Sequence, residues 1–289
     1  MNRIKSYIDN HASGLDRKTK FISVLSGKGG VGKSVFANSL ADITSRMHIR
    51  VLLVDTDFNS GNLHLLSNLR AEFGVVNYMK GELSLYEAIT TIRENLDLLA
   101  SPSNKEFTDL NEIAPIAKLV EKLRADASSY DLVIFDHPSG ISKSSTIVAH
   151  GSDINLLVMI PELTSISDSY GLFKFLIQAN PILDCRLLIN RTINSDETKY
   201  IFQKFTALTS RFLERELPLF GNLPESEEIR KSVMKQTPIA ELSPESIVVQ
   251  LFNNMSRSLI RNNAPQRIDL EKLSNQGINE NAAEADIKE

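Results

Sequence analysis

Eight consecutive residues near the start of the chain have the types and spacing to bind phosphate: Gly27-Lys28-Gly29-Gly30-Val31-Gly32-Lys33-Ser34. They fit the pattern G-x-x-x-x-G-K-[ST], in which backbone N–H groups of a glycine-rich turn and of a helix N-terminus surround phosphate oxygens. In this pattern Lys33 contacts the β- and γ-phosphates and the Ser34 hydroxyl binds Mg²⁺. The sequence therefore predicts a nucleoside triphosphate site whose other phosphate contacts come from Gly29, Gly30, Val31, Gly32 and Val35.

Aspartates follow two apolar runs elsewhere in the chain. Residues 51–54 lead into Asp55 and Asp57, and residues 132–135 lead into Asp136. Ligands of parallel α/β sheets bind beyond the carboxyl ends of the strands, so we expect these carboxylates beside the phosphate-binding loop. Carboxylates at that place suit the coordination of Mg²⁺ and the positioning of a water molecule. We therefore expect Asp136 to help hold a Mg²⁺ ion.

Strands and helices can be placed around these residues from the apolar pattern. Continuous apolar runs predict parallel strands covered on both faces, and apolar residues at helical spacing predict the helices between them. The alternation predicts an α/β fold, a single three-layer domain with a mostly parallel central sheet and helices on both faces. The predicted strands are 21–26, 51–54, 96–100, 132–135, 154–160 and 186–189, and the predicted helices begin at 35 or cover 110–125, 168–178, 196–214 and 245–261.

Composition limits the classes of protein to which the chain can belong. The 289 residues carry a formal net charge of −4, which argues against a strongly basic DNA-binding protein. No apolar run approaches the ~20 residues of a membrane span, and no apolar signal-peptide core follows the N-terminus, so we expect a cytoplasmic protein. The single cysteine, Cys185, cannot form an internal disulfide and is expected to be a buried thiol.

The loop contains a second lysine, Lys28, which phosphate binding within one subunit does not require. With this lysine, the loop GKGGVGKS resembles the deviant Walker A loop of the MinD/ParA family of P-loop ATPases. The resemblance implies ATP or ADP with Mg²⁺ as ligands, and an ATP-dependent homodimer in which Lys28 reaches the nucleotide of the other subunit. It implies that Lys28, Lys33 and Asp57 are catalytic, with Asp57 orienting the attacking water. The Mg²⁺ ligands that it implies are Ser34, Asp55 and Asp136.

Further segments resemble the same family. Residues 136–140 have the D-x-P-x-G spacing of its switch II, in which the backbone N–H of Gly140 would sense the γ-phosphate. Asn190 and Arg191 follow a predicted strand, where the family uses an asparagine to read the adenine edge. An amide suits that edge because it offers both a donor and an acceptor. A G-x-x-P-E stretch resembles the family's adenine-flanking loop and ends in Pro224 and Glu225.

The sequence predicts three parts: a leader of residues 1–20, an ATPase domain of residues 21–261 and an acidic tail of residues 262–289. Within the leader, residues 10–16 resemble the D-Q-A-x-x-L-R segment with which flagellar-number ATPases of the FlhG group dock on the signal-recognition-type GTPase FlhF. Asp16 stands where that segment has arginine, so whether the leader stimulates the GTPase stays open. The alternative to partner docking is a disordered leader that frays. The tail has three basic and six acidic residues, a composition that predicts disorder.

The function that these resemblances favour is FlhG-like regulation of flagellar number or placement by a dimerising ATPase, with ATP hydrolysis resetting the dimer. Residues 161–170 support it, because they resemble the P-E-x-T-S-I-x-D-x-Y stretch of the MinD/FlhG group. The implied partners are a second copy of the chain, the GTPase FlhF, and a flagellar regulator or switch component.

Two alternatives stay open at this point. A MinD-type division-site regulator predicts a C-terminal membrane helix, whereas the nearest candidate, residues 267–273, is short and charge-balanced. A weak membrane-surface contact therefore remains an alternative, with a location at the inner face of the cell membrane or at the cell pole. A ParA-type DNA-partition ATPase predicts a basic patch, and the near-neutral body of the chain argues against DNA binding.

Overall fold

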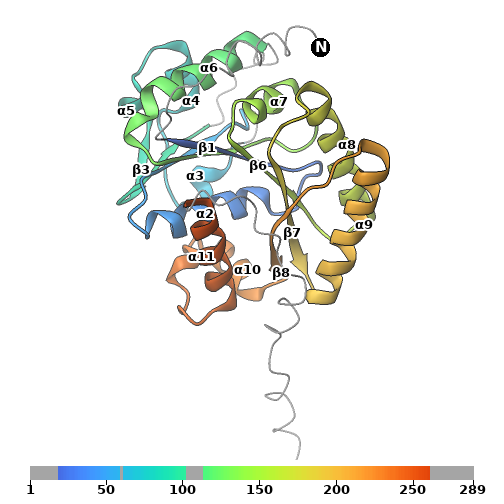
Figure 1. Cartoon of the computed structure of the whole chain (residues 1–289). Helices are drawn as coiled ribbons and strands as arrows, with labels where there is room; N and C mark the ends of the chain where they lie inside the picture. Colours follow the sequence, from blue (N-terminus) through green and yellow to red (C-terminus); the bar gives the residue numbers. More distant parts are fainter. Residues whose placement is uncertain (1–18, 59–60, 102–112, 261–289) are drawn as a thin grey trace, which may run out of the picture.

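The computed structural model describes residues 19–58, 61–101 and 113–260 (Figure 1). Its centre is an eight-stranded sheet with the order β3-β4-β2-β5-β1-β6-β7-β8. Neighbouring strands are parallel except for the antiparallel pair β3 and β4 at one edge. The strands are β1 (Lys20–Leu25), β2 (Val51–Asp55), β3 (Thr90–Arg93), β4 (Leu96–Leu99), β5 (Leu132–Asp136), β6 (Ile154–Met159), β7 (Cys185–Thr192) and β8 (Leu219–Pro224).

Helices cover both faces of the sheet. Alternate residues of each strand point to opposite faces, so Ile22 and Val24 of β1 pack in one cluster and Phe21 in another. The first face is covered by α2 (Lys33–Ser45), α3 (Leu63–Leu66) and α11 (Ile247–Ile260), together with the short turn η2 (Ile239–Glu241). The second face is covered by α4 (Val75–Lys80), α5 (Leu85–Ala88), α6 (Ile113–Asp126), α7 (Lys143–His150), α8 (Leu163–Ala179) and α9 (Ser195–Leu213).

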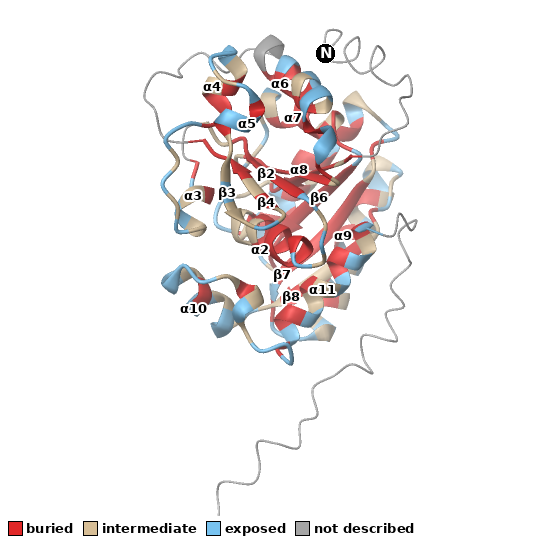
Figure 2. Ribbon diagram, turned by 90° about the vertical axis from the view of Figure 1, so that its left-hand side faces the viewer, coloured by how far each residue is buried: buried red, intermediate tan, exposed pale blue. Residues whose placement is uncertain are grey.

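The predicted three-layer α/β fold with a mostly parallel sheet is therefore confirmed. Figure 2 shows the strands as the buried layer between helices whose outer faces are exposed. The remaining helix, α10 (Glu227–Lys235), contacts η2, and a 3₁₀ turn, η1 (Ala127–Ser129), follows α6. Cys185 is free and buried, as expected, and burial raises the pKa of its thiol to about 12.

Some elements differ from their predicted limits. β1 begins at Lys20, so the first strand includes the last residue of the predicted leader. α8 begins at Leu163 and not at 168, because Ser165 and Ser169 occupy its buried face and weaken the apolar pattern. Residues 1–18 of the leader, the tail after Ile260, and the predictions made for them lie outside the described residues.

Within the described residues, none of the helices combines the length and the apolar character needed to cross a bilayer. Over the same ranges, the protein has no group of three or more His, Cys, Asp or Glu side chains placed to hold a metal ion.

A buried histidine follows β5. The side chain of His137 is completely buried, and its Nε2 lies 2.9 Å from the Ser23 hydroxyl of β1. That hydroxyl lies 2.8 Å from the Ser152 hydroxyl before β6, so the chain of contacts crosses three strands. Burial, and to a smaller extent the charge of Lys33, lowers the pKa of His137 to about 3. The ring is therefore neutral in the folded protein at every pH near neutrality.

This histidine predicts a loss of stability in mild acid. The unfolded chain binds a proton at His137 below its ordinary pKa of about 6.5, whereas the folded protein does not, so stability is present above that pH and falls as the pH drops. Between pH 7 and pH 5 we expect His137 to lower the free energy of unfolding by about 2 kcal/mol. Denaturant unfolding of the wild type and of His137→Gln at both pH values measures this difference. Equal pH dependence of the two proteins would contradict it.

Candidate functional site

The phosphate-binding loop joins β1 to α2 at the carboxyl edge of the sheet. Gly30 and Gly32 have φ angles of 78° and 88°, a left-handed conformation that glycine adopts most easily. The first residue of the loop, Gly27, packs so closely on α8 that a Cβ there would lie 2.3 Å from the carbonyl carbon of Asp168. The first backbone N–H groups of a helix have no partner within the helix, and no side chain caps those of α2. This geometry fits a bound phosphate.

The charged centre of the site is a buried ion pair between Lys33 and Asp136. The Nζ of Lys33 lies 2.7 Å from Oδ1 of Asp136 and 3.3 Å from the Ser34 hydroxyl. The register of β2 and β5 places Asp55 directly beside Asp136. Ser34, Asp55 and Asp136 together offer the hard oxygen donors that Mg²⁺ prefers. The residues predicted to bind Mg²⁺ therefore lie together.

The second carboxylate, that of Asp55, accepts hydrogen bonds from the segment that follows β2. Its Oδ1 accepts a hydrogen bond from the backbone N–H of Asp57 at 3.0 Å, and its Oδ2 accepts one from Leu63 at 3.3 Å. Burial, and then the neighbouring charge of Asp136, raises the pKa of Asp55 to about 7. Asp57 is half-buried and lies two residues beyond the end of β2. The start of α3 and the position of Asp57 therefore depend on the same carboxyl group.

Lys28 faces away from the buried part of the site. Its Nζ lies 2.6 Å from Oε2 of Glu162 and 2.8 Å from the Thr164 hydroxyl, which belong to the start of α8. The side chains of Lys28 and Glu162 are 35% and 54% exposed, whereas that of Lys33 is 7% exposed. The two lysines of one loop thus have different environments, one at the surface and one in the interior.

In this conformation the backbone N–H of Gly140, predicted to sense the γ-phosphate, already has a partner within the chain. This N–H donates a hydrogen bond of 2.9 Å to the carbonyl of Ser26, the residue before the phosphate-binding loop. The same N–H is therefore not presented to a phosphate here. Gly140 has a φ of 87°, so the turn after β5 is held in a conformation that favours glycine.

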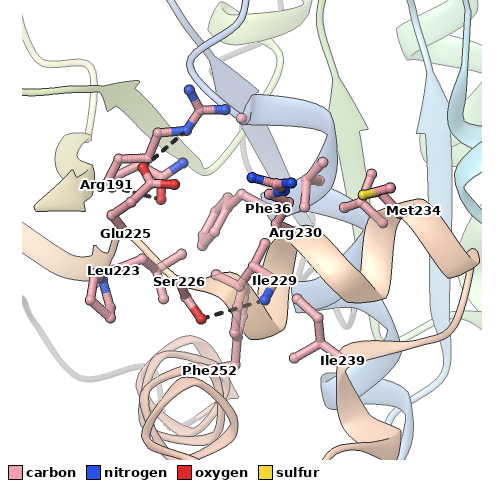
Figure 3. A pocket seen from close by; sticks show the side chains of 15 residues that line it. Phe36, Arg191, Leu223, Glu225, Ser226, Ile229, Arg230, Met234, Ile239 and Phe252 are labelled. Atoms are coloured by element: carbon pink, nitrogen blue, oxygen red, sulfur yellow. Dashed lines mark hydrogen bonds and ion pairs between the residues drawn. The ribbon is translucent and has the colours of Figure 1, made fainter.

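A cavity of about 390 Å³ lies next to the loop, between β7, β8, α10 and α11 (Figure 3). The four residues predicted to contact adenine all line it: Asn190, Arg191, Pro224 and Glu225. The guanidinium of Arg191 and the carboxylate of Glu225 form an ion pair at 3.8 Å. Arg191 has a φ of 57°, which is uncommon for a residue other than glycine and is typical of functional sites.

Asn190 connects this cavity to the phosphate-binding loop. Its Nδ2 donates a hydrogen bond of 2.7 Å to the carbonyl of Val31, and its Oδ1 accepts one of 3.0 Å from the backbone N–H of Arg191. A Cβ on Gly32 would lie only 2.5 Å from that Nδ2. An amide has two N–H donors and two acceptor lone pairs, so one of each remains for a base. Asn190 is therefore placed both to contact a base and to hold the loop.

The apolar wall of the cavity was not predicted as part of the site. Phe36 of α2 and Phe252 of α11 stack with their ring centroids 5.6 Å apart. Ile229 and Val233 add the inner face of α10. Their spacing of four residues is a helical signal that could have identified α10 as one wall of a pocket.

Comparison with known proteins agrees with this geometry. Residues 22–239 match the CobQ/CobB/MinD/ParA nucleotide binding domain. The chain belongs to this family. The fold also matches the septum site-determining protein MinD from Pyrococcus horikoshii, solved as a complex with Mg-ADP. That match has a TM-score of 0.70 and 24% identity, and it covers 83% of this chain and 96% of that one.

Curated relatives within the family include flagellar and septum proteins. The antiactivator FleN of Pseudomonas aeruginosa is 29% identical over 82% of this chain and 85% of its own. The flagellum site-determining protein YlxH of Helicobacter pylori is 24% identical over 89% of this chain and 85% of its own. The septum site-determining protein MinD of Bacillus subtilis is 27% identical over 86% and 91%, respectively. A protein named for flagellum siting and one named for septum siting thus have similar identities to this chain.

The contacts of Asn190 predict that its replacement weakens phosphate binding as well as base binding. Asn190→Ala leaves the buried carbonyl of Val31 without its partner, at a cost of about 1–3 kcal/mol. We expect the affinity for inorganic tripolyphosphate, which has no base, to fall at least about fivefold, together with the affinity for ATP. Glu225→Gln is the control, because Glu225 lines the same cavity and its carboxylate pairs with Arg191 and not with the loop. Unchanged tripolyphosphate binding by Asn190→Ala, measured by calorimetry, would limit Asn190 to reading the base.

Proposed function

We propose that this protein is an ATP-hydrolysing switch that dimerises on ATP and regulates flagellar number or placement. The observation that carries the proposal is the contrast between the two loop lysines. Lys33 is buried at the site of its own subunit, whereas Lys28 lies at the surface on Glu162 and Thr164. A lysine in that position is available to a phosphate that approaches from outside the subunit.

Nucleotide binding follows from the residues inside the site. ATP would place its phosphates in the loop from Gly29 to Val35, and Lys33 would exchange Asp136 for the β- and γ-phosphates. Ser34, Asp55 and Asp136 would then hold Mg²⁺, which neutralises charge on the phosphates. The complex of the Pyrococcus horikoshii protein with Mg-ADP supports this ligand pair. The base would lie in the cavity lined by Arg191 and Glu225.

Hydrolysis would act as the reset of the switch. Asp57 lies beyond the carboxyl end of β2, close to the predicted Mg²⁺ ligands, which suits a residue that orients the attacking water. In the dimer, Lys28 of each subunit would contact the nucleotide of the other. Loss of the γ-phosphate would remove that contact and favour separation, because a ligand shifts an equilibrium only through its different affinity for the two states.

The flagellar role is supported by the relative YlxH, which is named a flagellum site-determining protein. We propose a second copy of the chain, the GTPase FlhF and a flagellar regulator or switch component as partners, at the cytoplasmic face of the cell membrane or at the pole. A MinD-type role in division is the second candidate, because the Bacillus subtilis protein is 27% identical over a similar share of the chain.

One experiment separates these roles. The Asp57→Ala protein is loaded with ATP or with ADP and used to capture partners from a lysate of the source cells. Capture of FlhF or a flagellar regulator with ATP supports the flagellar role. Capture of a division inhibitor instead supports the MinD-type role and overturns the flagellar one.

Asp57→Ala should bind ATP and accumulate as a dimer, because without an oriented water the γ-phosphate persists. We expect the hydrolysis rate to fall at least about a hundredfold, in the range lost with a catalytic group of this kind. Light scattering in the presence of ATP should give twice the monomer mass of 32.2 kDa. A protein that holds ATP and remains monomeric would contradict the proposed role of Asp57.

Lys28→Ala should keep its affinity for ATP and lose ATP-dependent dimerisation. The Nζ of Lys28 contacts Glu162 and Thr164 and not the buried ion pair, so its removal should leave the site within the subunit intact. Lys118→Ala is a matched control, since Lys118 is an exposed lysine on α6. Sedimentation with and without ATP measures the effect. Equal dimerisation of the two variants would show that Lys28 is not a contact between subunits.

A further inference from the structure

The side chain of Gln236 connects the end of α10 to α3. Its Nε2 donates a hydrogen bond of 2.7 Å to the backbone carbonyl of Leu65, which is 171 positions away in the chain. Gln236 follows the last residue of α10 and has a φ of 52°, a left-handed conformation that is uncommon for residues other than glycine. Glycine would adopt this conformation more easily, but it has no side chain that could reach α3. The contact with Leu65 is therefore a feature that glutamine adds at the end of α10.

The beginning of α3 is connected to the predicted Mg²⁺ site. The backbone N–H of Leu63, the first residue of α3, donates a hydrogen bond to Oδ2 of Asp55, whose Oδ1 accepts one from Asp57. The buried residue of this four-residue helix is Leu63, whereas Leu65 is 52% exposed. Short elements with few buried contacts open at a small cost in free energy. The position of α3 therefore depends on its hydrogen bonds to Asp55 and Gln236.

The cavity proposed to hold the base lies on the inner side of α10 (Figure 3). Ile229 and Val233 of α10 line this base cavity, and the buried residue of α10 is Ser232. Val233 also lines a second, smaller cavity, whose wall includes Leu66 of α3. A helix with so little buried surface gains order from a ligand that packs on it. A base in the cavity would therefore fix α10 and, with it, the side chain of Gln236 at its end.

We propose that Gln236 is a positioning residue for hydrolysis: through α3 and Asp55, it makes the position of Asp57 depend on whether a base fills the base cavity. This inference rests on the proposed function, and it adds that the base accelerates hydrolysis as well as raising affinity. A polyphosphate without a base would fill the phosphate-binding loop and leave α10 without a ligand. The two kinds of ligand would thus favour different positions of α3, which is the condition for coupling between two parts of a site.

Hydrogen exchange measures this coupling directly, because the backbone N–H groups of residues 65–69 donate hydrogen bonds within α3 and just after it. ADP and pyrophosphate carry the same two phosphates, and only ADP carries a base. With saturating Mg²⁺ and ligand, we expect these amides in the wild type to exchange at least about threefold more slowly with ADP than with pyrophosphate. In Gln236→Leu, which cannot donate the hydrogen bond, we expect the two ligands to give equal rates.

Kinetics test the consequence for hydrolysis. For Gln236→Leu we expect kcat for ATP to fall about fivefold, as for the loss of one hydrogen bond, and KM to change less than about twofold. Gln236→Lys keeps an N–H donor on a long side chain and should retain at least about half of the wild-type kcat. The matched control is Gln250→Leu, because Gln250 is exposed on α11 and its Nε2 likewise donates to a backbone carbonyl, that of Glu245. This control should match the wild type in both measurements.

The results separate this inference from the proposed function. If the wild type fails to bind ADP or to hydrolyse ATP, the proposed function is overturned. If the wild type does both and Gln236→Leu matches Gln250→Leu, the inference about Gln236 is overturned. It is also overturned if Gln236→Leu melts at a lower temperature and its amides exchange faster by the same factor with ADP and with pyrophosphate, because Gln236 would then only stabilise the fold. A difference between the two ligands that disappears in Gln236→Leu and returns in Gln236→Lys supports the inference.

Discussion

The buried ion pair between Lys33 and Asp136 is the interaction on which the site depends. Its charged atoms lie 2.7 Å apart, and both side chains are more than nine-tenths buried. Either partner alone would be an uncompensated charge in the protein interior, which is strongly destabilising. The pair therefore holds the first turn of α2 against the end of β5. Lys33 can leave Asp136 only when another anion, such as a phosphate in the loop, takes its place, and Asp136 then needs another cation. The charges of this site thus link the entry of a nucleotide to the entry of a divalent cation.

The carboxylate of Asp55, which lies beside Asp136, couples these charges to the segment that follows β2. Lys33 contacts Asp136 and not Asp55, and burial together with Asp136 raises the pKa of Asp55 to about 7. A cation between the two carboxylates would favour the ionised form of Asp55. Because Asp55 also accepts hydrogen bonds from Asp57 and Leu63, a change in its charge acts on the segment that leads into α3. The predicted metal site and the position of Asp57, the residue proposed to orient water, therefore both depend on Asp55.

Sequence reasoning succeeded where a local pattern determines the structure. β2 and β5 are continuous apolar runs that end in aspartate, so both the strands and the meeting of Asp55 with Asp136 could be predicted. β8 was missed because Gly221, Asn222 and Pro224 interrupt its apolar run, and it forms through pairing with β7. The aromatic wall of the cavity joins Phe36 to Phe252, which are far apart in the chain. The contact between Asn190 and Val31 likewise depends on tertiary structure, so a residue predicted only to read a base also holds the loop.

Lys28 and Lys33 differ in the free energy that is needed to separate each of them from its present partner. An exposed ion pair such as that of Lys28 with Glu162 contributes about 0–1 kcal/mol, whereas a charge-assisted hydrogen bond to a phosphate contributes about 1.5–3 kcal/mol. Lys28 can therefore exchange Glu162 for a phosphate with a net gain. Lys33 cannot leave its buried partner until a phosphate is already in the loop of its own subunit. In the proposed dimer, this difference would set an order of events: a nucleotide would bind within one subunit first, and Lys28 of the second subunit would complete the site afterwards.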